Sequence, residues 1–65
     1  MSNQELSILS NREKEVVLYL LDGHATKDIA DKLSIKPNTV STIKKNAFSK
    51  LKVSNVVEAY KLVVK

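Results

Sequence analysis

Residues 27–51 read KDIADKLSIKPNTVSTIKKNAFSKL, and this stretch decides the fold. Apolar side chains recur at helical spacing over 27–33 and again over 37–51, with three residues between the two runs. Pro37 opens the second run, at the helix position that best tolerates proline because its missing N–H has no partner there. Ile35 places one aliphatic side chain in the short connection. Two helices joined in this way form a helix-turn-helix.

Another helix is predicted ahead of this pair, over about 11–22. Ser10 and Glu13 have the spacing of a capping box, in which each side chain binds the other residue's backbone N–H. Gly23 follows as a residue suited to the left-handed conformation that ends many helices. Thr26 is the expected side-chain cap of the next helix. The inward-facing residues predicted along these two helices are Leu9, Val16, Tyr19, Leu20, Ile29, Ala30 and Leu33.

The last predicted helix runs to about Val63 and opens with a second capping box, made by Asn55 and Glu58. A helix that is apolar on two faces packs against two surfaces. We expect one to be the domain core and the other the same helix of a second copy across a two-fold axis. The alternative is that Tyr60 and its neighbours only cover more of the core. The core-facing stripe is Ala59, Leu62 and Val63, and the candidate dimer interface is Val57, Tyr60, Lys61 and Val64.

The composition describes one small globular domain. The chain has 65 residues, 43% hydrophobic and 28% charged, and no cysteine that could form a disulfide or a thiolate metal site. We expect neither a secretory signal nor a membrane span, because the first residues lack the basic and apolar regions of a signal and no apolar run approaches the ~20 residues that a span requires. We expect an all-α, compact four-helix domain over 9–65, preceded by a tail or linker remnant over 1–8. The expected location is the cytoplasm, with no membrane contact, cofactor or metal.

Charge divides the chain into unlike halves. Residues 1–31 hold three basic and six acidic side chains, whereas residues 32–65 hold eight basic and one acidic, so the net charges are −3 and +7. Residues 36–52 contain five lysines and no acid. A basic segment on an otherwise balanced chain is the usual footprint of a polyanion such as nucleic acid.

The helix over 37–51 has separate apolar and polar faces. At 100° per residue, four apolar residues fall within about 80° and a polar set falls within another arc of about 100°. The polar set has no acid, and its side chains are of types that reach base edges and phosphates in a major groove. An ordinary solvated surface is the alternative, although such surfaces usually mix both signs of charge. The apolar set is Val40, Ile43, Ala47 and Leu51, and the polar set is Asn38, Ser41, Thr42, Lys45, Ser49 and Lys52.

Several short motifs stand at fixed spacings along the chain. They are Leu9-Ser10-Asn11-Arg12-Glu13, Val16-Val17, Gly23, Ile29-Ala30-Asp31-Lys32-Leu33, Thr39-Val40 and Lys50-Leu51-Lys52-Val53. Over about 9–63 this pattern resembles the C-terminal domain of the LuxR/FixJ/NarL family. The resemblance implies a double-stranded DNA-binding output domain of a bacterial transcription regulator, in particular a response regulator. It also implies a homodimer through the fourth helix, an N-terminal receiver or sensor domain, and RNA polymerase as a further partner.

The resemblance also implies roles for single positions. Ser41, Thr42 and Lys45 match groove-facing positions of the family, and Asn38 joins them as a base-reading candidate. Family members often carry Lys or Arg in place of Ser41, His in place of Ile43, and Ser or Thr in place of Lys36, so base preference is not carried over. The candidates for phosphate contact are Lys27, Lys36, Thr39, Lys50 and Lys52.

Parts of the sequence are also compatible with other functions. Region 4 of sigma factors has a related pattern, and a small protein-interaction module could use the Tyr60 stripe, although it leaves the acid-free helix unexplained. An enzyme is not expected, because the single histidine, His24, lies in a turn without clustered carboxylates and is expected to face solvent. If the chain is a fragment, its regulatory switch lies upstream of Met1; if it is complete, concentration sets its activity.

Overall fold

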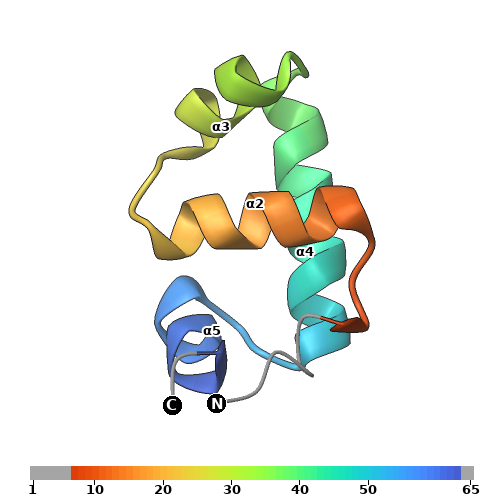
Figure 1. Cartoon of the computed structure of the whole chain (residues 1–65), viewed down its shortest axis with the longest axis vertical. Coiled ribbons are helices and arrows are strands. Elements are labelled where there is room, and N and C mark those ends of the chain that lie inside the picture. Colours follow the sequence, from red (N-terminus) through yellow and green to blue (C-terminus); the bar gives the residue numbers. More distant parts are fainter. Residues whose placement is uncertain (1–6, 64–65) are drawn as a thin grey trace.

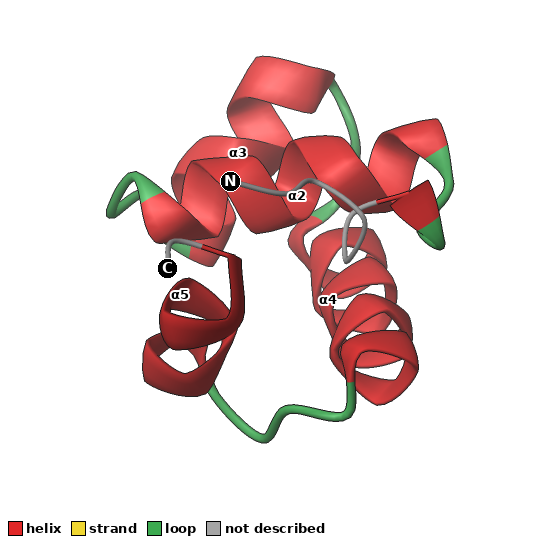
Figure 2. Cartoon of the chain, turned by 60° about the horizontal axis from the view of Figure 1, so that its bottom comes forward, coloured by secondary structure: helices red, strands yellow, loops and turns green. Residues whose placement is uncertain are grey.

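The helix-turn-helix is present in the computed structural model, which describes residues 7–63. The described helices of the domain are α2 (Asn11–Leu21), α3 (Thr26–Leu33), α4 (Pro37–Leu51) and α5 (Val56–Val63), and α3 and α4 form the helix-turn-helix. No strand occurs in the described part of the chain. α4 runs along the back of the molecule and crosses α2, while α3 lies against the beginning of α4 (Figure 1). α4 and α5 lie on opposite sides below α2, and a loop connects them (Figure 2). No helix among residues 7–63 combines the length and apolarity needed to cross a bilayer.

The core forms where α2, α3 and α4 meet. Val16, Val17, Ile29 and Val40 are fully buried, and small alanines on three helices allow close packing. All the predicted inward residues lie in the core or pack against it, with Tyr19, Leu33, Ile43, Leu62 and Val63 half-buried; Val17 of α2 is fully buried although it was not predicted. The reason is that α2 contacts α3, α4 and α5, so its buried arc is wider than a single stripe. The buried apolar residues are Leu9, Val16, Val17, Leu20, Ile29, Ala30, Val40, Ala47, Phe48, Leu51 and Ala59.

The capping box at the start of α2 is confirmed. The backbone N–H of Glu13 donates to Ser10 Oγ at 3.2 Å, and the Ser10 N–H donates to Glu13 Oε1 at 2.9 Å. A side-chain cap of this kind contributes about 1 kcal/mol to stability. The tail predicted over 1–8 lies largely outside the described residues.

The box at the start of α5 differs in one of its two bonds. Asn55 Oδ1 accepts from the Glu58 N–H at 2.9 Å, as predicted. Glu58 Oε1, however, accepts from the Ser54 N–H at 2.7 Å instead of from the N–H of Asn55. The glutamate therefore reaches one residue further back and fixes the loop that enters α5.

The predicted cap at Thr26 is wrong. Thr26 is already the first helical residue of α3, and Ala25 is the N-cap, without a side-chain hydrogen bond. The Ala25 carbonyl accepts from the Ile29 N–H at 3.0 Å, which starts the helix one residue earlier than the sequence indicated. α2 also ends one residue early, because Asp22 forms its C-cap.

The first three of these helices end with the same backbone arrangement. Gly23, Ser34 and Lys52 follow α2, α3 and α4 in the left-handed region, with φ of 94°, 58° and 59°. The next residue then donates its N–H back into the helix, which is the Schellman motif. Ile35 and Val53 occupy that next position after α3 and α4, and both pack against the core. The three bonds are His24 N to Tyr19 O, Ile35 N to Ala30 O and Val53 N to Phe48 O, each 3.0 Å.

Candidate nucleic-acid interface

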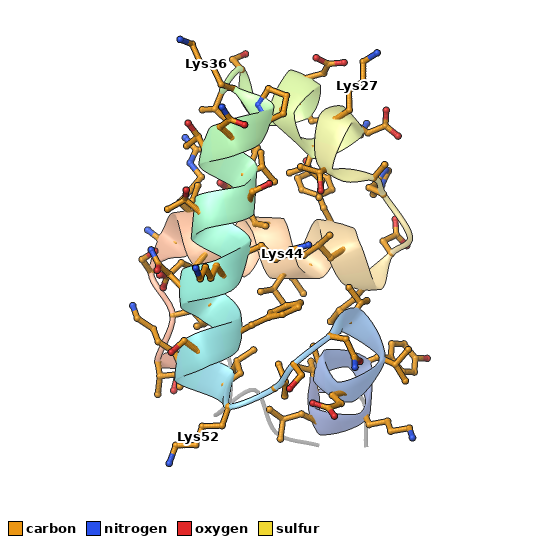
Figure 3. All side chains as sticks on the ribbon, turned by 180° about the vertical axis from the view of Figure 1, so that it is seen from behind. Lys27, Lys36, Lys44 and Lys52 are labelled. Carbon is orange, nitrogen blue, oxygen red and sulfur yellow. The ribbon has the colours of Figure 1, made fainter. Side chains whose placement is uncertain are left out.

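The outward face of α4 is polar and exposed, as predicted. Its buried side consists of Val40, Ala47, Phe48 and Leu51, and Ile43 is half-buried beside them. Figure 3 views the molecule from the side on which α4 lies in front. No acidic residue occurs in α4, so the face offers hydrogen-bond donors and acceptors together with positive charge. Its exposed members are Asn38, Ser41, Thr42, Lys45, Asn46 and Ser49.

Two lysines differ from the helical projection. Lys52 lies beyond the last residue of α4 with a left-handed backbone, so the 100° step does not place it on the polar arc. Lys44 was not selected as a site residue from the sequence, and it is half-buried. A long aliphatic stem can cover apolar surface while its amine stays in water. The sequence did carry a sign of this placement, because 100° per residue puts Lys44 between the apolar and the polar arc of the helix.

One end of this surface is positive for two reasons. Lys27 lies in the first turn of α3 and Lys36 is the N-cap of α4, and both ammonium groups extend from the same end of the molecule (Figure 3). Neither helix start has a side-chain cap; the first turn of α4 contains no acid, whereas that of α3 contains Asp28 beside Lys27. Backbone N–H groups at a helix start carry the positive end of the helix dipole and suit an anion such as phosphate.

Lys50 makes a contact that the sequence did not indicate. Its Nζ donates to Glu13 Oε1 at 2.9 Å, and the Glu13 side chain is only 11% exposed. The hydrogen bond from Lys50, followed by that from the Ser10 N–H, lowers the pKa of the Glu13 carboxyl below its ordinary value. The charge of Lys50 is thus compensated within the domain, and the pair holds the last turn of α4 against the start of α2.

Thr42 has only part of its side chain available to a ligand. Its hydroxyl donates to the carbonyl oxygen of Asn38, one turn earlier in α4, at 3.1 Å. The hydroxyl proton is therefore used within the helix, and the methyl group remains on an exposed side chain. A methyl group at this position is suited to an apolar contact with a base edge.

His24 is not the solvent-facing residue that its turn position suggested. Its ring makes an edge contact with Tyr19 at 5.2 Å between centroids, and its side chain is 29% exposed. Nε2 lies 3.2 Å from Asp22 Oδ2. Residues 7–63 contain no group of three His, Asp or Glu side chains placed to hold a metal ion. An open hollow of about 460 Å³ nearby is lined by Glu15, Leu18, Tyr19 and Asp22, all on α2 or its cap.

These features define a class of protein. A helix-turn-helix whose second helix exposes an acid-free polar face, with lysines near both ends, is a helix-turn-helix DNA-binding domain. The sequence profile of bacterial regulatory proteins, luxR family, matches residues 7–63. The chain belongs to this family, which confirms the resemblance found in its sequence.

Curated relatives agree with the family. The chain is 40% identical over 57 residues to the Fimbriae Z protein of Escherichia coli strain K12, covering 88% of this chain and 27% of that protein. It is equally similar over 57 residues to the DNA-binding transcriptional activator EvgA of the same strain, covering 88% and 28%. It is 43% identical over 53 residues to the putative positive transcription regulator BvgA of Bordetella pertussis, covering 82% and 25%. The chain thus spans about a quarter of the length of these relatives, and no solved structure matches it.

Proposed function

We propose that this domain binds specific sequences of double-stranded DNA with α4 in the major groove. The exposed, acid-free face of α4 carries this proposal. Asn38, Ser41, Thr42 and Lys45 lie on it and would contact base edges. The phosphate backbone would be held at the end of this surface that is formed by the starts of α3 and α4. Such contacts would fix the register of the domain on DNA without specifying sequence. The residues for that contact are Lys27, Lys36 and Thr39, all exposed.

The domain is proposed to act as a dimer through α5. Ala59 is buried and Leu62 is half-buried, whereas Val57 is 62% and Tyr60 49% exposed. One face of α5 is thus turned toward the core, while Val57 and Tyr60 are exposed on another, with Lys61 exposed beside them. Val64, the remaining interface candidate, lies outside the described residues. One domain makes a small DNA interface, and two domains on adjacent half-sites would supply more affinity and specificity.

The longer relatives suggest the setting in which such a domain works. Two are named as a transcriptional activator and a positive transcription regulator, and each is about four times as long as the matched segment. We propose that this chain is the output domain of a response regulator, acting in the cytoplasm and controlled by an N-terminal receiver or sensor domain. Contact with RNA polymerase would then connect DNA binding to transcription.

The experiment that tests DNA binding is a fluorescence-anisotropy titration of a labelled duplex at several salt concentrations. Wild type is expected to bind with an affinity that falls steeply with salt. Lys45→Ala should bind more weakly, whereas Lys14→Ala, the same charge change on α2, should resemble wild type. No binding of the folded domain at low salt would reject the proposal and favour a protein-interaction module that uses α5.

A further inference from the structure

Two lysines at the end of α4 have the same charge but different surroundings. Lys50 donates to Glu13 at 2.9 Å, and the resulting ion pair is covered on the Glu13 side. Lys52 is exposed, and its side chain makes no ion pair or hydrogen bond with any residue of 7–63. Moving Lys50 to an outside anion would leave a nearly buried carboxylate uncompensated. Lys52 can meet an anion without breaking any contact within the described part of the domain.

Lys52 has a backbone conformation that glycine adopts more easily than lysine. Its φ of 59° lies in the left-handed region, where a Cβ is crowded and glycine is favoured. Gly23 occupies the equivalent position after α2 and Ser34 the one after α3, so this chain accepts both glycine and a residue with a side chain at such a turn. The Schellman bonds at position 52 involve backbone atoms alone and do not need a lysine. Strained residues that persist are often functional.

The position of Lys52 fits a phosphate. It extends past the C-terminal end of α4, whereas Lys36 extends from the opposite end (Figure 3). α4 has 15 residues and is about 22 Å long. Because the major groove is about 12 Å wide, a helix of this length that crosses it reaches the backbone at its end.

We propose that Lys52, and not Lys50, contacts a DNA phosphate, and that lysine is retained at this left-handed position for binding although glycine would make the fold more stable. Lys50 instead holds α4 against α2 through Glu13. This inference rests on the proposed function. It gives two lysines of the same charge, two positions apart, different roles: Lys52 contacts DNA and Lys50 stabilises the fold.

The test measures salt dependence and stability on the same variants. The probe is a fluorescein-labelled 20-bp duplex of mixed sequence, titrated in a series of salt concentrations. Lys52→Gln keeps the strained backbone and removes the charge. It should lower affinity about five- to tenfold at 0.1 M salt and reduce the slope of log K against log salt by about 0.9. Lys50→Gln is the matched control; it should melt at a lower temperature but keep the wild-type slope.

Lys52→Gly separates charge from strain. It should bind as weakly as Lys52→Gln, yet its melting temperature should be about 4–8 °C higher than that of Lys52→Gln. Equal slopes for wild type and Lys52→Gln would overturn the phosphate contact, as would a slope reduced only in Lys50→Gln. Equal melting temperatures for the Gly and Gln variants would overturn the proposed conflict between binding and stability. A wild-type domain that is folded by circular dichroism but does not bind the duplex would overturn the proposed function itself.

Discussion

Glu13 Oε1 and Lys50 Nζ lie 2.9 Å apart and connect the first turn of α2 to the last turn of α4. The same Oε1 atom accepts the N–H of Ser10, so one oxygen serves both the helix cap and the tertiary contact. The Glu13 side chain is 11% exposed and the Lys50 side chain 47%, so the carboxylate is covered while the ammonium group stays in contact with water. This carboxylate therefore has more effect on stability than an ordinary surface glutamate.

We predict that Glu13→Gln lowers the free energy of unfolding by about 1–3 kcal/mol at pH 7. The amide oxygen can still accept from Ser10, but the charged partner of Lys50 is lost. Urea unfolding followed by circular dichroism measures the difference. The control is Glu15→Gln, which removes an exposed pair with Arg12 at 3.2 Å and should change stability by less than about 1 kcal/mol. Equal effects of the two substitutions would contradict the prediction.

The same pair predicts a dependence of stability on pH. The pKa of Glu13 is lowered from 4.5 in the folded domain, mainly by the hydrogen bond from Lys50, so folding favours the ionised carboxylate. Its contribution is fully present above the unfolded pKa and is lost as pH falls through the lower folded pKa. The stability difference between wild type and Glu13→Gln should therefore shrink as pH is lowered from 6 to 3. A difference that stays constant over this range would exclude the linkage.

Much of the fold could be predicted because the signals are local. The turn residues Pro37 and Gly23, the Ser10 cap and the apolar stripe of α4 each act within a few residues of their own position. Thr26 misled the prediction because threonine suits both a cap and a first helical turn, and the backbone bond from Ala25 decided between them.

The candidate site could be predicted only in part. The exposed face of α4 follows from helical periodicity, and the structure agrees with it. The pairing of Lys50 with Glu13 joins residues 37 positions apart, and no local pattern carries that information. The left-handed backbone at Lys52 was equally hidden, because glycine is the usual signal for that conformation and is absent there.

Thr42 is predicted to recognise DNA through its methyl group. Its hydroxyl is bonded to the Asn38 carbonyl, so Thr42→Val should keep affinity for a preferred site selected from random duplexes. Thr42→Ser, which removes the methyl, should weaken binding about fourfold, the value of one buried methyl group. The apolar group expected to meet this methyl is the methyl group of a thymine, so replacing that thymidine by deoxyuridine should have the same effect on wild type and none on Thr42→Ser. A stronger loss in Thr42→Val than in Thr42→Ser would show that the hydroxyl is the group that matters.

Tyr60→Asp is predicted to weaken self-association without unfolding the domain, since half of this side chain is already exposed. Leu18→Asp offers a matched control, because Leu18 is 50% exposed against 49% for Tyr60 and lies on α2. Analytical ultracentrifugation of both variants measures the association, and a duplex with two half-sites measures cooperative binding. If Leu18→Asp dissociates the dimer and Tyr60→Asp does not, the interface lies on α2 and not on α5.

Gly23 and Ser34, the left-handed residues after α2 and α3, are predicted to respond in opposite ways when glycine is removed from one and introduced at the other. Gly23 has φ of 94° and nothing within 4 Å of the position a Cβ would take, so Gly23→Ala meets only backbone strain. It should lower the free energy of unfolding by about 1–2 kcal/mol. Ser34 has φ of 58° and is exposed, so Ser34→Gly relieves strain at the turn between α3 and α4.

Ser34→Gly should therefore raise the free energy of unfolding, by less than Gly23→Ala lowers it, because a residue with a Cβ is less strained at φ of 58° than at 94°. Urea unfolding of the two single variants and the double variant measures both effects. The sites belong to different turns, so their effects should add within about 0.5 kcal/mol. A destabilising Ser34→Gly would mean that the serine side chain stabilises the turn by more than its left-handed backbone costs.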